Sequence, residues 1–155
     1  MRVVLDTNVL VRGAKHAAGP VRELLSLLQS GPHVIVISRE ILVELVRVLD
    51  YPRLCKLHRL TPEERRDFVT SLDNLAEHVA LSPGAAAAIS TDPDDNLVVQ
   101  TGVAGQVDVI CTRDRHLLHA NVKTYCSNLG IRLLHDSELL DELRRSATGV
   151  EPTRE

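Results

Sequence analysis

The sequence predicts an α/β fold in which a parallel sheet of about five strands is covered by helices on both faces. Short apolar runs alternate along the chain with longer segments whose apolar residues recur at helical spacing. Hydrophobic residues make up 44% of the 155 residues, but aromatic residues only 2%. Aliphatic side chains must therefore fill the core, as they do around buried parallel strands. The length fits one domain, which we expect at residues 1–146, with a disordered tail at 147–155.

The first strand and the first clear helix lie before residue 30. Residues 2–5 form an apolar run that is too short for a helix and rich in β-branched residues, which favours a buried strand. Residues 20–29 have apolar side chains at helical spacing. Pro20 stands at the first helical position and Gly31 just past the end, as is typical of helix boundaries.

A second strand and two helices are expected next. Residues 33–37 form the strand, and Ser38 has the character of a helix N-cap. Apolar residues at helical spacing then continue until Pro52, which ends that helix. Residues 61–75 begin with a Thr that is followed three residues later by a Glu, the pattern of a capping box.

The second half of the chain repeats the alternation. We expect a weak strand at 79–81, a helix that begins in the polar cluster 91–96, strands at 107–111 and 131–134, and a final helix at 137–145.

Charge and cysteine content limit the classes of function. The formal net charge is −3 and the sequence pI is about 6.2, whereas nucleic-acid binders are usually basic. If the chain acts on nucleic acid, bound metal ions would have to offset its charge locally. The scarcity of aromatic residues argues against a base-stacking surface.

Three cysteines without a CxxC pair favour reduced thiols in a cytoplasmic protein. No segment has the roughly 20 apolar residues of a membrane helix, and the N-terminus has no secretory signal pattern.

Acidic residues follow two of the predicted strands. Asp6 closes the first strand, and Asp114 lies just past the end of strand 107–111. Ligands bind outside the carboxyl ends of parallel strands, so we expect both side chains at one edge of the sheet.

Two further acids are candidates for the same edge. Glu44 lies in the second turn of the helix after the second strand, with Glu40 as its rival one turn earlier. Asp95 begins the helix before the fourth strand, and Asp92 and Asp94 are its neighbours. Clustered carboxylates repel one another unless a cation joins them, and Mg²⁺ or Mn²⁺ prefers oxygen ligands. A carboxylate-held metal pair activates water and stabilises a phosphoryl displacement. No Cys and His pattern with zinc spacing competes for this role.

Four blocks of sequence, taken in order, resemble the PIN-domain nucleases, and within them a branch described as toxins of toxin–antitoxin pairs. The resemblance covers about residues 1–145. The blocks are Val3-Val4-Leu5-Asp6-Thr7-Asn8-Val9-Leu10, Ser38-Arg39-Glu40-Ile41-Leu42-Val43-Glu44-Leu45, Asp92-Pro93-Asp94-Asp95-Asn96 and Asp108-Val109-Ile110-Cys111-Thr112-Arg113-Asp114.

The resemblance implies a three-layer α/β/α sandwich that cleaves single-stranded RNA with Mg²⁺ (or Mn²⁺), and it implies roles for individual residues. The metal-binding and catalytic acids are Asp6, Glu44, Asp95 and Asp114. The supporting residues are Thr7 and Asn8, which match small polar positions beside Asp6, then Thr112, and as weaker candidates Asp92 and Asn96. Candidate phosphate contacts are Arg12, Lys15, Arg39 and Arg113.

Two positions depart from the family pattern. Many relatives have Gly directly before the last acid, where this chain has Arg113, whose side chain would either narrow the site or bind a phosphate. The helix after Asp95 contains Thr101-Gly102 where relatives often have a small apolar pair, and Gly weakens a helix interior by roughly 1 kcal/mol.

Several alternatives remain open from the sequence. A partner antitoxin and a homodimer are expected by resemblance only, with no membrane partner. The same chemistry would cut DNA, because the sequence has no feature that reads the 2′-hydroxyl. A non-catalytic binding module with this fold is a further alternative. A phosphatase of the haloacid-dehalogenase type is disfavoured because Asn8 stands where its second Asp would be.

Overall fold

The computed structural model describes residues 1–14, 19–82 and 93–149, and of residues 93–96 only the backbone. In this part of the chain, a sheet of parallel strands has the order β3-β2-β1-β4-β5. The strands are β1 (Arg2–Leu5), β2 (Val34–Ser38), β3 (Glu77–Val79), β4 (Val109–Cys111) and β5 (Arg132–Leu134).

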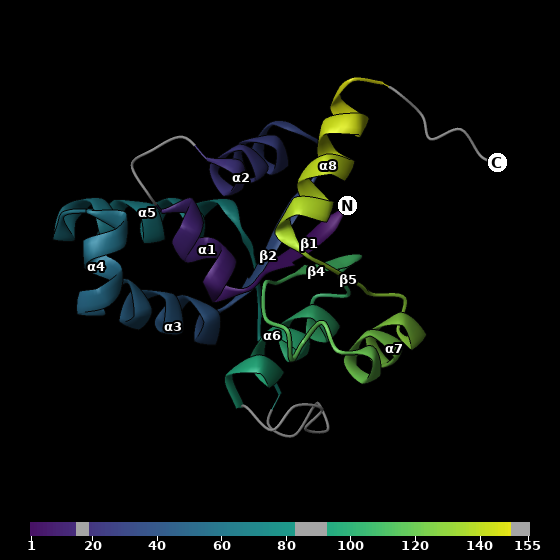
Figure 1. Cartoon of the computed structure of the whole chain (residues 1–155). Helices are drawn as coiled ribbons and strands as arrows, with labels where there is room; N and C mark the ends of the chain where they lie inside the picture. Colours follow the sequence, from purple (N-terminus) through teal and green to yellow (C-terminus); the bar gives the residue numbers. More distant parts are fainter. Residues whose placement is uncertain (15–18, 83–92, 150–155) are drawn as a thin grey trace.

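Helices cover both faces of the sheet (Figure 1). They are α1 (Thr7–Gly13), α2 (Pro20–Ser30), α3 (Arg39–Leu49), α4 (Pro52–His58), α5 (Pro62–Leu75), α6 (Pro93–Ala104), α7 (Ala120–Asn128) and α8 (Asp136–Ala147). Helices α2 and α8 pack against each other on one side of the sheet, and α6 and α7 lie on the other. The predicted fold class, a three-layer α/β/α sandwich around a parallel sheet of five strands, is confirmed.

The strand order reverses between β1 and β4. The chain goes from β1 to β2 and β3 on one side, and then returns to add β4 and β5 on the other side of β1. Leu5 pairs with Cys111 at the carboxyl ends of the two strands. At such a reversal of strand order, the connections leave in opposite directions and open a ligand-binding crevice. The residues that directly follow Leu5 and Cys111 therefore lie side by side at this edge of the sheet.

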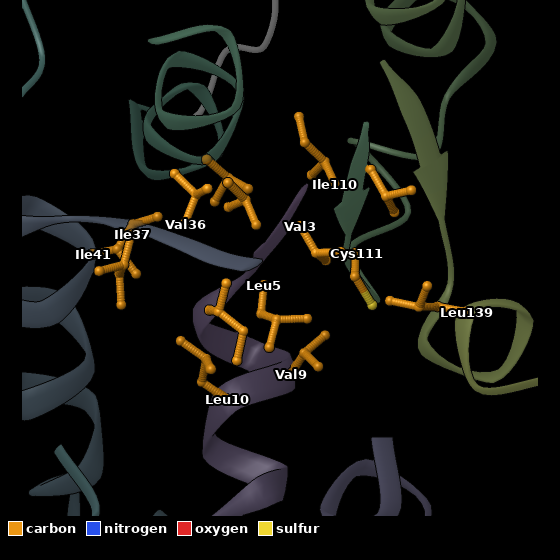
Figure 2. Packing of buried hydrophobic residues seen from close by; sticks show 14 of the residues in the cluster. Val3, Leu5, Val9, Leu10, Val36, Ile37, Ile41, Ile110, Cys111 and Leu139 are labelled. Atoms are coloured by element: carbon orange, nitrogen blue, oxygen red, sulfur yellow. The ribbon is translucent and has the colours of Figure 1, made fainter. Parts of the chain in front are cut away.

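The core holds these strand ends in place. Val3 and Val109 are fully buried, and Leu5 is almost so. Figure 2 shows Leu5 packed close to Val9 and Leu10 of α1, so the helix that begins beside Asp6 shares the core with the strand before it. Each fully buried aliphatic side chain of this size contributes about 1.5–3 kcal/mol.

The helix caps predicted at Ser38 and Thr61 are present, whereas the N-cap of α8 is His135 and not Asp136. Ser38 accepts a hydrogen bond from the backbone N–H of Ile41 at 3.3 Å and fixes the start of α3. Thr61 and Glu64 form both bonds of a capping box at the start of α5. Pro20 is the first residue of α2. These local signals are strong because they satisfy backbone groups that the helix itself leaves unpaired.

Other elements differ from the expectation. No helix was expected directly after Asp6 or from Pro52 onward, yet α1 and α4 lie there. For α4 the reason is that proline at a first helical position starts a helix as readily as it ends the previous one. Strand β3 is at Glu77–Val79 rather than 79–81. Helix α8 runs to Ala147, two residues beyond its expected end, and residues 150–155 of the predicted tail lie outside the described part.

Gly102 has a packing role that the sequence analysis did not foresee. A Cβ atom at this position would lie 2.6 Å from Cδ1 of Ile110. The absence of a side chain therefore lets α6 approach β4 closely. Gly102, which by itself weakens the helix, thus permits the close contact between α6 and β4.

Candidate active site

The backbone of Asp6 joins three elements. Its N–H donates to the carbonyl oxygen of Cys111 at 2.9 Å, which extends the pairing of β1 with β4 by one residue. Its own carbonyl accepts from the N–H groups of Val9 and Leu10, at 2.9 and 3.0 Å, at the start of α1. Asp6 is the N-cap of that helix in extended conformation. The position of its side chain, which is 8% exposed, is therefore set by the sheet and by α1 together.

Thr112 connects two of the predicted acids. This fully buried residue follows β4 directly. Its Oγ1 donates to Oδ2 of Asp6 at 2.6 Å and accepts from the backbone N–H of Asp114 at 3.0 Å. One hydroxyl group thus orients the carboxylate after β1 and the loop after β4.

Glu44 rather than Glu40 faces the site. Oγ1 of Thr7 donates to Oε2 of Glu44 at 2.6 Å, and Glu44 is half-buried while Glu40 is exposed. Thr7 was expected to support Asp6; its backbone hydrogen-bonds to Asp6, while its hydroxyl contacts Glu44. Asn8 is exposed, and its Oδ1 accepts from the backbone N–H of Arg113 at 3.4 Å.

The carboxylate of Asp6 is influenced by the charges of two other acids, Glu44 and Asp114. The pKa of Asp6 is raised to about 6, mainly by burial and to a smaller extent by the negative charges of Glu44 and Asp114. Hydrogen bonds from the Thr112 hydroxyl and from the backbone of Thr7 act in the opposite direction. Asp114 is half-buried, and its Oδ1 accepts from the backbone N–H of His116 at 2.8 Å. Glu44 and Asp114 therefore both lie near enough to Asp6 for their charges to act on it.

These three acids suit a divalent cation in donor type and charge. They offer only oxygen ligands, which Mg²⁺ and Mn²⁺ prefer. A cation would also remove the repulsion that raises the pKa of Asp6. Within the described residues, however, no group of three or more acidic, His or Cys side chains lies close enough together to bind a metal unaided. A metal would therefore need small side-chain movements, further ligands or water.

The side chains of four further predicted site residues are not among those that the structure describes. The side chains of Asp95 and Asn96, in the first turn of α6, are not described, and neither are Asp92 and Lys15. The next residue of α6, Leu97, lines a surface hollow together with Glu44. The beginning of α6 is therefore next to the part of α3 that carries the predicted ligand.

Arg113 is held by an acid that the sequence analysis did not include in the site. Its Nη1 lies 3.0 and 2.8 Å from the two carboxylate oxygens of Asp136, the first residue of α8. The side chain of Asp136 is only 5% exposed, and Nδ1 of His135 lies 2.8 Å from its Oδ1. This ion pair ties the loop between Thr112 and Asp114 to α8. In the sequence, an Asp at the start of a helix is typical of a helix cap, so no local pattern indicated that Asp136 pairs with Arg113.

The other candidate phosphate contacts are exposed. Arg12 lies in the last turn of α1 and Arg39 at the start of α3. All three cysteines are free, and burial raises the pKa of the Cys111 thiol, with further contributions from the charges of Asp136 and Asp6. No helix among the described residues is both long and apolar enough to cross a membrane.

A parallel α/β sandwich with acidic side chains at its strand-order reversal defines a class of proteins that bind metal ions or phosphates at this edge. The model of the PIN domain matches residues 2–116, which is well over half of the chain. The chain therefore belongs to the PIN domain family, whose members are nucleases that generally use divalent metals.

A solved structure shares the fold. It is described as VapBC2 from Rickettsia felis bound to a DNA fragment from their promoter, and the match has a TM-score of 0.57 at 15% sequence identity. The aligned region covers 87% of this chain and 98% of that chain. A comparison with curated proteins gave no match.

Proposed function

We propose that this protein is a divalent-metal-dependent endoribonuclease that cleaves single-stranded RNA, and that it is the toxin of a toxin–antitoxin pair. The observation that carries the proposal is the position of Asp6 and Asp114 after β1 and β4, where the strand order reverses. Glu44 and Asp114 lie close enough to Asp6 for their charges to add to the effect of burial on its raised pKa. Membership of a nuclease family supports the reaction class.

In the proposed mechanism, Asp6, Glu44, Asp95 and Asp114 hold Mg²⁺ or Mn²⁺. When bound, the metal lowers the pKa of a water molecule and stabilises the charge that develops on the phosphate. Thr112 keeps Asp6 oriented by donating to Oδ2, and Thr7 does the same for Oε2 of Glu44. These bonds leave the carboxylates pre-positioned, which reduces the reorganisation that metal binding requires.

The second group of proposed residues assists the acids and the substrate. Arg12, Lys15 and Arg39 contact phosphates. Arg113 has one nitrogen committed to Asp136, so any phosphate contact uses its other guanidinium nitrogens. Asn8 supports the loop of Asp114 through the backbone of Arg113. We also propose that Asp92 and Asn96 support Asp95.

The toxin role is proposed from the four sequence blocks that resemble the toxin branch of the family. The fold shared with VapBC2 from Rickettsia felis is consistent with this proposal. By this proposal, a small antitoxin covers the acidic edge of the sheet, with a basic side chain to balance its charge. A cytoplasmic location and a homodimer form part of the same proposal.

The test is cleavage of fluorescent oligonucleotides by the purified full-length chain with Mn²⁺ or Mg²⁺. We expect single-stranded RNA to be cut internally, with no cleavage in EDTA. Asp6→Asn and Asp114→Asn should lower kcat/KM by about a thousandfold or more. Asp67→Asn, which alters an exposed acid of α5, should behave as wild type.

The substrate panel also contains single-stranded DNA. Equal cleavage of the RNA and the DNA oligonucleotide would indicate a general nuclease rather than a ribonuclease. Folded protein that cuts neither oligonucleotide would contradict the proposal. A rate that is unchanged in Asp6→Asn would reveal a contaminating nuclease.

A further inference from the structure

The exposed face of α3 has a repeating pattern that the acidic site does not use. Arg39, Val43 and Arg47 recur at every fourth position and therefore lie on one side of the helix. The opposite side packs into the core through Ile41 and Leu45, which are fully buried. Val43 is 61% exposed, although it is a large aliphatic residue.

This face borders a surface hollow of about 490 Å³, which we call the α3 hollow. It is lined by Arg39, Glu40, Val43, Glu44, Arg47 and Leu97. Its volume lies within the usual range of small-ligand sites. Glu44 belongs both to the α3 hollow and to the acidic cluster, so a ligand in the hollow extends directly to the acids.

The two arginines lie on opposite sides of Glu44 along the helix axis. With a rise of 1.5 Å per residue, Arg39 lies about 7.5 Å before Glu44 and Arg47 about 4.5 Å after it. A strand whose scissile phosphate is near Glu44 would therefore pass one arginine before the site and one after it. The chain carries a net charge of −3, so two arginines beside the acids provide a local attraction for a polyanion.

The remaining lining fits a nucleotide that is bound without regard to its base. Val43 and Leu97 offer apolar contact to a sugar or to the face of a base. Such contacts do not distinguish base edges, because they make no directional hydrogen bonds to them.

We propose that the α3 hollow binds single-stranded nucleic acid next to the scissile phosphate, with Arg39 and Arg47 contacting phosphates on opposite sides of it. The inference rests on the proposed nuclease function and specifies how the substrate runs: along α3. Arg47 is a substrate contact that the sequence analysis did not include. Glu40 opposes binding, because its exposed carboxylate lies in the same hollow.

The test measures binding separately from cleavage. Fluorescence anisotropy gives the Kd of a labelled eight-nucleotide single-stranded RNA in EDTA, where no metal-dependent cleavage occurs. Arg39→Ala and Arg47→Ala should each weaken binding by about three- to tenfold. Each should also reduce the slope of log K against log salt concentration by about 0.7, the value for one phosphate contact on a single strand. Glu40→Gln should strengthen binding.

Matched controls distinguish the loss of a phosphate contact from a loss of the fold or of overall positive charge. Arg66→Ala removes an exposed arginine of α5 and should leave both the Kd and the salt slope unchanged. In Mn²⁺, the α3 variants should raise KM for the eight-nucleotide substrate and leave kcat within about twofold, because the acids are intact.

The outcomes distinguish this inference from the proposed function. Wild-type protein that binds the oligonucleotide but never cleaves it would contradict the nuclease function, and the α3 variants would still decide the inference. Arg39→Ala and Arg47→Ala variants with wild-type Kd and salt slope would overturn the inference, as would a wild-type protein that binds no single strand. In that case, the exposed Val43 would be better explained as part of a protein interface.

Discussion

Asp6 is a carboxylate whose surroundings favour its neutral form. Burial is the main cause of its raised pKa of about 6, and Glu44 and Asp114 add to it. Because the folded pKa lies above the value of 3.8 for an unperturbed Asp, the stabilising effect of this group is fully present below about pH 4. It is lost as the pH rises through about 6. The loss amounts to about 3 kcal/mol for a shift of about two units. A metal ion that binds the ionised form would offset it.

The first prediction concerns the substitution Asp6→Asn. Without metal at pH 8, the variant should be more stable than wild type by about 1–3 kcal/mol, because it removes a buried charge that repels two others. At pH 4 the difference should largely disappear, since wild-type Asp6 is then mostly protonated. Thermal unfolding in EDTA at both pH values measures this. A variant that is equally destabilised at both pH values would show that the ionised carboxylate of Asp6 does not lower the stability of the wild-type protein.

The second prediction concerns the hydroxyl group that links two acids. Thr112→Val keeps the shape of the side chain but leaves Oδ2 of Asp6 and the N–H of Asp114 without this partner. We expect a loss of about 1–3 kcal/mol in stability. The pH midpoint of activity should also shift upward, because the hydroxyl lowers the pKa of Asp6. Thr112→Ser retains the hydroxyl and should retain the wild-type midpoint. Equal midpoints in the Val and Ser variants would contradict this role.

At the scale of elements, the loop after β4 is fixed at two points. Thr112 ties it to the end of β1, and the pairing of Arg113 with Asp136 ties it to α8. The loop carries Asp114, so the position of this acid depends on an ion pair whose acidic member is buried. Helix α8 also packs on α2, which places the pair within the main body of the fold.

The third prediction follows from that ion pair. Arg113→Ala should destabilise the protein by about 1–3 kcal/mol, because it leaves the buried carboxylate of Asp136 with His135 but without its arginine. Adding Asp136→Asn should recover most of this loss, since the uncompensated charge is then gone. Urea unfolding of both single variants and the double variant forms the thermodynamic cycle. Strictly additive effects would mean that the two side chains do not depend on each other.

The fourth prediction concerns the contact of α6 with β4. Gly102→Ala should destabilise the protein by about 1–3 kcal/mol through overpacking against Ile110, although Ala is the better helix former. Ala104→Gly, at an exposed position near the end of the same helix, is the comparison and should cost no more than about 1 kcal/mol. A gain in stability for Gly102→Ala would show that the helix can move away from the sheet at little cost.

The elements that were predictable from sequence are those with local signals. Ser38 and the capping box of α5 mark helix starts through bonds to nearby backbone groups. The strand ends placed Asp6 and Asp114 at one edge of the sheet. Helices α1 and α4 were missed because seven residues are too few to display a helical period. The contact of Thr7 with Glu44 and that of Arg113 with Asp136 join residues 37 and 23 positions apart, and no local pattern encodes them.

At the scale of the whole molecule, the order of the strands is what gathers the acids. Asp6 and Asp114 are far apart in sequence, but β1 and β4 are neighbours where the strand order reverses. Glu44 joins them because α3 follows the strand on the other side of β1. The fold thus concentrates negative charge at one edge, which the proposed divalent cation would balance.

The most direct measurement of this claim is isothermal titration of the metal-free protein with Mn²⁺ at pH 8. We expect saturable binding to wild type that weakens as the pH falls below about 6, because Asp6 must be ionised to bind metal. Asp67→Asn should bind like wild type, whereas Asp6→Asn and Asp114→Asn should lose most of the affinity while remaining folded. Mn²⁺ binding with wild-type affinity in Asp6→Asn would contradict the assignment of the site to these acids.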